Sequence, residues 1–162
     1  MRQMVALLVV ITCVVSEGLA FQARGGATGE KAGSGACSFL SKELVMKVSG
    51  SVNKHVFDLP PEEEKVGKGT ACSYADIVLQ VDVFTPDAID GIAKKAATEW
   101  TPLSGIGDAA YFRNNKNNYA EIIGRVGTRT FTIQLGVPFQ STVEKTKPNA
   151  VTLAHAIVAK LR

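Results

Sequence analysis

The chain opens with a continuous apolar run over residues 4–15, which follows the basic residue Arg2 and ends near Gly18-Leu19-Ala20. A basic start, an apolar core and a small-x-small end are typical of a cleaved secretory signal peptide. The run is about a dozen residues, whereas a membrane-spanning helix needs about 18 or more. The pattern therefore predicts a signal peptide over residues 1–20, and a secreted or periplasmic protein without a transmembrane anchor after cleavage.

Three later segments show the spacing and end signals of helices. Residues 41–50 begin with a capping serine, carry an acid in the first turn and end at a glycine. Residues 85–98 begin with threonine, proline and an acid, which together favour a helix start. We expect a last helix to begin at Lys147-Pro148 and to continue to the end of the chain.

Several segments between turn residues are expected to form strands, and from Ile77 to Phe84 the residues alternate along the chain. Residues 70–84 predict two strands with one buried face, and residues 109–113, 119–125 and 130–136 predict three more, joined as hairpins. Residues 59–69 contain two prolines, three acids and two glycines, so we expect an exposed, mobile excursion without regular structure.

The order of these elements is α-β-β-α-β-β-β-α, with most strands in consecutive hairpins. Such an order favours an antiparallel sheet over a doubly wound parallel sheet. We therefore predict an α+β fold in which helices cover an antiparallel sheet of about five strands. Residues 36–162 would form this single domain, after a disordered leader over residues 21–35 that carries five glycines and few bulky apolar side chains.

The number and positions of the cysteines limit which disulfides can form. Cys13 lies in the signal and should leave with it, unless it is the lipid-bearing first residue of a lipoprotein; Thr12 before it is not the small residue normally found there. Cys37 and Cys72 then remain, and an even pair in an oxidising compartment predicts a disulfide. A redox role has no support because the chain lacks a C-x-x-C pair.

Four segments together resemble a known group of proteins: Cys37-Ser-Phe-Leu-Ser41, Thr70-Ala-Cys72-Ser-Tyr74, residues 103–112 and a closing helix over residues 153–161. They are similar to small exported bacterial domains of unknown function, many of them lipoproteins. The resemblance covers residues 36–162 and is most specific at residues 105–112 and the two cysteines. It implies a fold similar to the Mog1/PsbP-like α+β sandwich, and it implies no activity, because that group has no assigned catalytic residues. This chain departs from the lipoprotein members because it lacks a convincing lipid-attachment cysteine.

The glycine-containing segment Ser104-Gly105-Ile106-Gly107 superficially offers a phosphate-binding loop. A nucleotide site needs such a loop to lead into a helix N-terminus, whereas a strand is expected to follow here. We favour a tight turn with positive φ at both glycines, in which Asp108 accepts local backbone hydrogen bonds. No cofactor is predicted.

Neither histidine is predicted to act as a catalytic base or a metal ligand. His155 lies on the last helix without an acid near it in sequence, and we expect it at the surface. His55 precedes Asp58 and further acids, so a loose metal site can be imagined, but zinc needs three or four well-placed ligands. We favour a solvated loop and no metal site. No serine lies in a G-x-S-x-G elbow, and no catalytic residue is predicted.

Charge is unevenly distributed along the chain. Residues 113–162 carry eight Lys and Arg against two acids, whereas residues 21–112 carry nine against twelve. A basic, partly aromatic surface would suit an anionic envelope component or an acidic protein partner, but not nucleic acid in an exported protein. The alternative is a solvated sheet face whose charges protect its edges. The residues of this expected binding surface are Trp100, Tyr111, Arg113, Tyr119, Arg125 and Arg129.

These observations predict an exported, non-catalytic domain that binds a partner or ligand at the envelope. The alternatives are a structural accessory without a small-molecule site, and an enzyme whose catalytic groups meet only in the fold. An apolar pocket near Trp100 and Tyr111 would favour ligand binding, and a flat basic face would favour a macromolecular partner. A buried carboxylate or histidine beside a hydroxyl in a cleft would favour an enzyme. Trp100 would either floor a ligand groove or close the core at a helix end.

Overall fold

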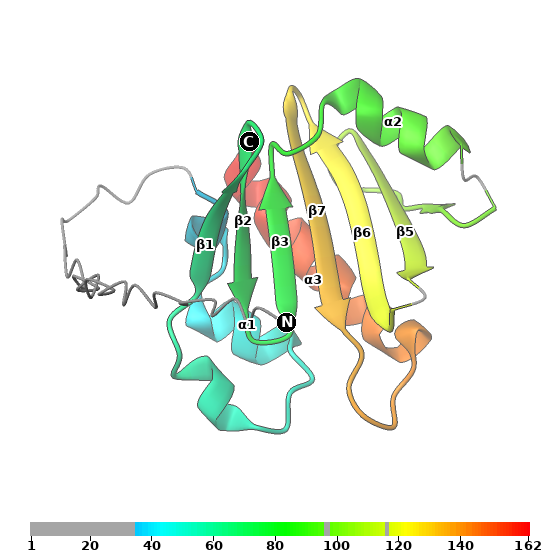
Figure 1. The fold of residues 1–162 in the computed structure, drawn as a ribbon. Coiled ribbons are helices and arrows are strands. Elements are labelled where there is room, and N and C mark those ends of the chain that lie inside the picture. Colours follow the sequence, from blue (N-terminus) through cyan, green and yellow to red (C-terminus); the bar gives the residue numbers. More distant parts are fainter. Residues whose placement is uncertain (1–34, 96–97, 116) are drawn as a thin grey trace, which may run out of the picture. The chain divides into compact units, whose positions relative to one another are not determined.

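The computed structural model describes residues 35–95, 98–115 and 117–162. Within them, seven strands form one antiparallel sheet in the order β1-β2-β3-β7-β6-β5-β4, accompanied by three α-helices (Figure 1). The strands are β1 (Glu62–Val66), β2 (Gly69–Tyr74), β3 (Ile77–Val81), β4 (Thr101–Pro102), β5 (Ala109–Asn115), β6 (Tyr119–Val126) and β7 (Arg129–Gly136). The helices are α1 (Lys42–Val48), α2 (Pro86–Lys95) and α3 (Val143–Leu161), with short 3-10 helices η1 (Ala36–Phe39) and η2 (Lys54–Phe57).

The α+β class and the antiparallel sheet are confirmed, but the predicted number of strands is wrong. The expected signal peptide, Cys13 and nearly all of the expected leader lie outside the described residues. Among the helices described, none combines the length and apolar character needed to cross a membrane.

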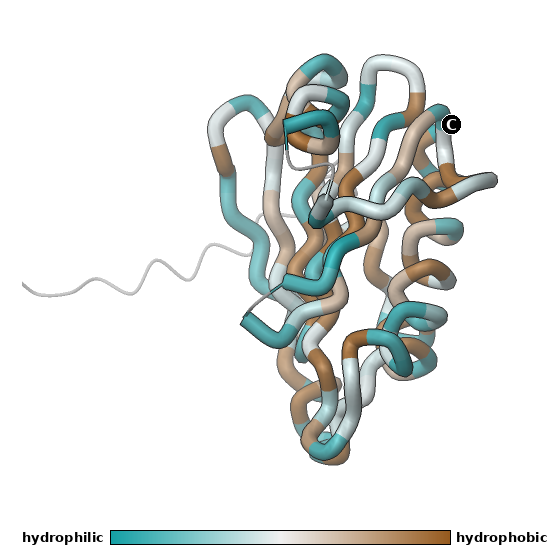
Figure 2. The backbone as a smooth tube through the Cα atoms, turned by 90° about the vertical axis from the view of Figure 1, so that its right-hand side faces the viewer, coloured by the Kyte–Doolittle hydropathy of each residue, from teal (hydrophilic) through white to brown (hydrophobic). Residues whose placement is uncertain are grey.

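The sheet separates two faces that differ in character. Strand residues such as Leu79, Ile122 and Ile133 point to one face and pack with α1 and α3 in the main hydrophobic core. In Figure 2 the tube of α3 alternates between brown and teal, which is expected for a helix with one buried stripe. The other face carries α2, which packs against β6 and β7. Because successive strand residues point to opposite faces, the long central strands place an apolar set on the first face and a more polar set on the second.

Strands β1 and β4 are the two strands that the sequence did not predict. β1 lies in the segment expected to be irregular, but Pro60 and Pro61 precede the strand and Gly67, with φ +59°, makes the turn into β2. β1 is an edge strand whose acidic side chains are exposed, which is a common way to discourage edge-to-edge pairing. Such a strand has no buried face and so lacks the alternation by which strands are predicted. β4 has only two residues, paired with Phe112 and Tyr111 of β5.

The helix starts follow their capping residues. Ser41 caps α1 by accepting a hydrogen bond from the Leu44 N–H at 3.2 Å, as its sequence indicates. The predicted start of α3 at Lys147 is wrong, because Thr142 caps the helix and accepts from the Lys145 N–H at 3.3 Å. Pro148 therefore lies in the second turn of α3, where it leaves one helical carbonyl without a backbone donor.

The predicted disulfide is confirmed, with a distance of 2.02 Å between the sulfurs of Cys37 and Cys72. It joins η1 to β2. The same segment is tied to the sheet by the Ala36 N–H, which donates to Thr70 Oγ1 at 2.8 Å, and by the Cys37 N–H, which donates to Glu63 Oε2 at 2.7 Å. The disulfide thus anchors the start of the described domain to the edge of the sheet.

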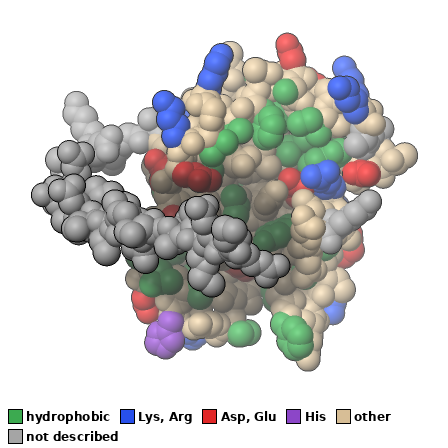
Figure 3. Space-filling model, in the orientation of Figure 1, with side chains coloured by type: hydrophobic (Ala, Val, Ile, Leu, Met, Phe, Trp, Pro, Cys, Tyr) green, Lys and Arg blue, Asp and Glu red, His purple; other side chains and the backbone are tan. Residues whose placement is uncertain are grey.

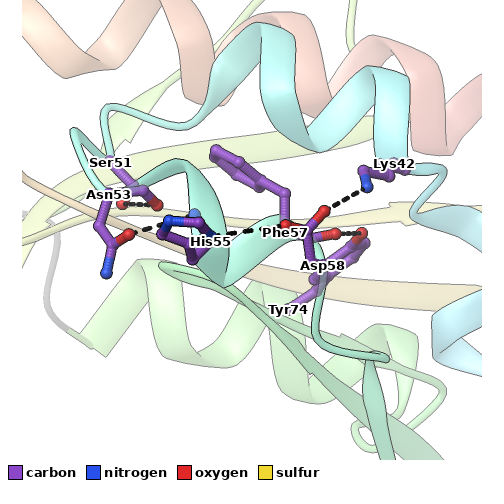
Figure 4. A network of polar contacts seen from close by, with 7 residues as sticks. All are labelled: Lys42, Ser51, Asn53, His55, Phe57, Asp58 and Tyr74. Atoms are coloured by element: carbon purple, nitrogen blue, oxygen red, sulfur yellow. Dashed lines mark hydrogen bonds and ion pairs between the residues drawn. The ribbon is translucent and has the colours of Figure 1, made fainter.

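A polar network holds η2 against α1 and β2 (Figure 4). The Tyr74 hydroxyl donates to the Phe57 carbonyl at 3.1 Å, and Lys42 Nζ donates to Asp58 Oδ1 at 2.9 Å. This hydrogen bond and the charge of Asp58 raise the pKa of Lys42 above its ordinary value. The His55 side chain is 94% exposed, as expected, but the residue lies in η2 and not in the irregular loop that was predicted.

The turn at Gly105 and Gly107 has the predicted conformation, with φ of +79° and +60°. Asp108 accepts a hydrogen bond from the Gly127 N–H at 2.6 Å, so its bond crosses to the β6–β7 turn and is not local as predicted. A Cβ atom on Gly107 would collide with the carbonyl oxygen of Arg125, whereas one on Gly105 would meet open space.

Replacing Cys72 by alanine should lower the free energy of unfolding by about 2 to 5 kcal/mol, because the disulfide restricts the unfolded chain. Chemical denaturation followed by circular dichroism measures this change. Wild-type protein treated with dithiothreitol is the matched control and should unfold like the variant. Equal midpoints for the oxidised wild type and Cys72→Ala would contradict a stabilising role for the bond.

The two turn glycines provide a matched pair of substitutions. Gly105→Ala should cost about 1 kcal/mol through left-handed backbone strain alone. Gly107→Ala adds a steric collision and should cost about 2 to 4 kcal/mol. Thermal unfolding should therefore place the melting temperature of Gly107→Ala well below that of Gly105→Ala, and the reverse order would refute the steric argument.

Candidate functional site

The α2 side of the sheet holds a second, smaller apolar cluster. Ile89 of α2 packs there with Trp100 and Ile123, and Ile92 and Tyr111 border the cluster. Figure 3 shows this side of the sheet, with hydrophobic side chains gathered in its upper part and charged side chains around them. Of the two alternatives predicted for Trp100, packing into an apolar cluster is the one that this arrangement favours.

A pocket of about 160 Å³ lies beside this cluster, and we call it the sheet-face pocket. Strands β3, β5, β6 and β7 supply its polar lining, and α2, the segments on either side of α2 and Ile123 of β6 supply the apolar part. Because strand residues two apart share a face, residues 121 and 123 of β6 and 132 and 134 of β7 line it together. The complete lining is Gln80, Phe84, Ile92, Trp100, Arg113, Glu121, Ile123, Thr132 and Gln134.

Glu121 is the most unusual residue of this pocket, because its carboxylate is buried and the residue is only 4% exposed. Arg113 Nε donates to Glu121 Oε2 at 2.6 Å, and Asn115 Nδ2 donates to the same oxygen at 2.9 Å. Gln134 Nε2 donates to Oε1 at 3.2 Å. Buried charges in proteins need such partners, and the sheet register supplies them by placing Arg113 and Gln134 directly opposite Glu121.

The indole ring of Trp100 packs against the same arginine. The Arg113 guanidinium carbon lies 4.5 Å from the centre of the ring, within the range of a cation–π interaction. Arg113 Nη1 also lies 3.7 Å from Glu99 Oε2. The guanidinium is therefore held between Trp100, Glu99 and Glu121, and its orientation at the pocket is fixed.

Two lining residues carry buried polar atoms without a hydrogen-bond partner in the described protein: Trp100 Nε1 and Thr132 Oγ1. Each residue is about 5% exposed. An indole N–H can only donate, and a threonine hydroxyl can donate and accept. An unsatisfied buried group of this kind costs about 1 to 3 kcal/mol, so most native proteins satisfy such groups.

The other predicted arginines lie away from this pocket and face carboxylates. Arg125 Nε is 3.4 Å from Asp90 Oδ2, and its Nη1 is 3.9 Å from Asp108 Oδ2. Arg129 Nε is 2.6 Å from Asp82 Oδ2. The acids come from the acidic part of the chain and the arginines from the basic part, so folding balances the charge that is separated along the sequence.

The predicted binding surface is thus divided into separate places. Trp100 and Arg113 meet at the sheet-face pocket, and Tyr111 borders the apolar cluster beside it. Arg125 and Arg129 form ion pairs elsewhere on the sheet, and Tyr119 lines a different hollow at the opposite end of β6. The structure therefore brings together two of the six residues in one pocket.

Sequence reasoning missed the polar floor of the pocket. Glu121, Thr132 and Gln134 alternate with buried apolar residues, and this pattern is typical of a half-solvated strand. One signal was present: Glu121 is one of only two acids among residues 113–162, and it lies inside an apolar strand. Its burial depends on cross-strand partners, which the sequence alone does not pair.

A larger hollow of about 520 Å³ adjoins the pocket and shares Arg113 with it. Its other lining residues are Thr98, Glu99, Asn114, Asn115 and Asn117, which adjoin positions 97 and 116 outside the description. Among the described residues, no group of three or more His, Cys, Asp or Glu side chains is placed to hold a metal ion. The sheet-face pocket is therefore the better-defined candidate site.

No known protein family, characterised protein or solved structure matches this chain.

Glu121→Gln should lower the free energy of unfolding by about 1 to 3 kcal/mol, because it weakens the charge-assisted hydrogen bond from Arg113 and leaves that cation without its buried partner. Glu99→Gln is the matched control: this residue is half-exposed and lies 3.7 Å from the same arginine, so its loss should cost under about 1 kcal/mol. Urea denaturation measures both. Equal effects of the two substitutions would contradict the special role of the buried carboxylate.

Proposed function

We propose that this protein is an exported, non-catalytic binding domain whose ligand enters the sheet-face pocket. The observation that carries the proposal is the pair of unpartnered polar atoms, Trp100 Nε1 and Thr132 Oγ1, on residues that line one pocket. A ligand that accepts a hydrogen bond would compensate these groups and would bind more tightly for that reason. Export follows from the expected signal peptide and is in keeping with the disulfide.

The size and lining of the pocket indicate the class of ligand. An engineered apolar cavity of about 150 Å³ holds one benzene molecule, so a pocket of about 160 Å³ is suited to one ring or a group of that size. Phe84, Ile92 and Ile123 provide apolar contacts. Arg113 and Glu121 form an ion pair with each other, so neither side chain needs a charged ligand to balance its charge. The favoured ligand is an uncharged, ring-sized group with a hydrogen-bond acceptor.

The same geometry argues against catalysis. A buried carboxylate and a hydroxyl do line one pocket, which is the arrangement that would favour an enzyme. Glu121, however, accepts hydrogen bonds from Arg113, Asn115 and Gln134, so its oxygens are engaged in holding the sheet face together. A general base must instead reach a proton of the substrate. We therefore assign Glu121 a positioning role for Arg113.

A structural accessory without a ligand remains the rival function, and nuclear magnetic resonance separates the two. Trp100 is the only tryptophan, so its indole N–H gives a single signal. Acetophenone, a ring with a carbonyl acceptor, should shift this signal downfield in a saturable manner. Toluene, a ring without an acceptor, should produce a smaller shift. Absence of a saturable shift with both compounds would contradict a binding function for the pocket.

Thr132→Val tests the hydroxyl. One net hydrogen bond is worth about 0.5 to 1.5 kcal/mol, so the variant should bind acetophenone about 2- to 10-fold more weakly and toluene equally well. Thr152→Val is the matched control, because this threonine is exposed on α3 and bonds only to the Pro148 carbonyl of its own helix. Equal losses for the two compounds in Thr132→Val would show that the hydroxyl does not contact the ligand.

A further inference from the structure

A second surface lies at the end of the sheet where the β2–β3 turn, Asn117 and Asn118 lie near the loops that follow α1 and β7 (lower end in Figure 1). We call it the loop-end surface. Its two large hydrophobic side chains are Val52, which is 96% exposed, and Phe139, which is 92% exposed. They are the most exposed large hydrophobic residues of the described chain, and both line one hollow of about 220 Å³. Apolar side chains gathered at one hollow mark an interaction site more often than isolated ones do.

Asp76 lies at the centre of this surface. It lines the hollow of Val52 and Phe139, and it also lines a neighbouring hollow of about 260 Å³ that reaches Asn118 and Tyr119. Gly136 and Val137 are likewise shared by both hollows. The two hollows therefore form one continuous surface with a carboxylate between them.

The carboxylate of Asp76 has unused capacity to accept hydrogen bonds. Its Oδ2 atom accepts a hydrogen bond from the Gly50 N–H at 3.3 Å, whereas Oδ1 is buried and has no partner in the described protein. Among the described residues, no lysine or arginine forms an ion pair with it, in contrast to Asp82, Asp90 and Asp108. A half-buried carboxylate without a cation favours a positively charged ligand group.

The backbone holds these loops in unusual conformations. Ala75, Asn118 and Gln140 have φ of +55°, +66° and +63°, and only one other described non-glycine residue has a positive φ. The Val137 N–H donates to the Asn118 carbonyl at 3.1 Å, which ties two of the loops together. Left-handed conformations of this kind gather at binding sites, where the surrounding structure maintains them. The loops of the loop-end surface are therefore fixed relative to one another by backbone contacts.

We infer that the loop-end surface binds an arginine side chain of a partner polypeptide. The guanidinium would pair with Asp76, its planar face would stack on Phe139, and its aliphatic stem would lie against Val52 and Pro138. Arginine meets these three requirements better than lysine, because its planar group can stack on a ring and bond to a carboxylate at once. This site is separate from the sheet-face pocket, because the two have no lining residue in common.

The test uses the purified protein with its disulfide intact and the peptide acetyl-Gly-Gly-Arg-Gly-Gly-amide. Nuclear magnetic resonance titration should shift the backbone amide signals of residues 75, 76, 118, 137, 139 and 140. The same peptide with citrulline, an uncharged analogue of arginine, should bind at least about 3-fold more weakly, because one exposed charge pair or cation–π contact contributes about that much. Binding of the arginine peptide should weaken as salt rises.

Two variants and two controls locate the site. Asp76→Asn and Phe139→Ala should each weaken binding of the arginine peptide by about 3- to 5-fold. Asp87→Asn and Leu59→Ala remove an exposed acid and an exposed hydrophobic residue elsewhere and should leave binding unchanged. Phe139 is almost fully exposed, so Phe139→Ala should fold normally and keeps the test decisive if Asp76→Asn is destabilised.

Three results would overturn the inference. One is equal affinity for the arginine and citrulline peptides, and another is binding that Phe139→Ala leaves unchanged. The third is a concentration-dependent dimer in sedimentation experiments that Phe139→Ala dissociates, because a second copy of the chain would then occupy the surface.

Discussion

The antiparallel pairing of β3 with β7 is the interaction on which the rest of this structure depends. It sets Leu79 opposite Ile133 and Gln80 opposite Thr132, and so joins the strands before α2 to the three long strands after it. This register determines both faces of the sheet. The odd-numbered residues of β3 and β7, such as Leu79 and Ile133, enter the main core, whereas Gln80, Thr132 and Gln134 line the sheet-face pocket. A shift by one residue would exchange the two sets, so the apolar core and the polar pocket are specified together.

The long elements of the fold could be predicted because each carries a signal within its own sequence. The alternation in β3 indicates one buried face, the apolar residues of β6 and β7 between turn residues indicate strands, and the side chains of Ser41 and Thr85 indicate helix starts. β1 could not be predicted in this way, since an edge strand that buries no side chain needs only a neighbour to pair with. The start of α3 was misplaced because a proline is tolerated in its second turn once Thr142 caps the helix.

The candidate site was predictable only in part, for a related reason. Trp100 and Arg113 stand out as large or charged residues near a turn, and they do meet at one pocket. The role of Glu121 depends on residues 8 and 13 positions away in sequence, which only the sheet brings beside it. Long-range pairing also changes the net charge of the surface. Arg125 and Arg129 predict a basic surface from the sequence, but in the fold they form ion pairs with acids from an earlier part of the chain.

The polar groups on the α2 side of the sheet bear on the proposal that this face binds a ligand. A sheet face that is to stay permanently covered is best lined with apolar residues, as the α1 and α3 side is. The α2 side instead keeps a buried carboxylate, a threonine hydroxyl and two glutamine amides beside apolar side chains. Buried polar networks are costly unless fully satisfied, and here Glu121 is satisfied while Trp100 and Thr132 are not. A fold selected for stability alone would fill such a pocket, so the unsatisfied pair supports the proposal that a ligand completes the site.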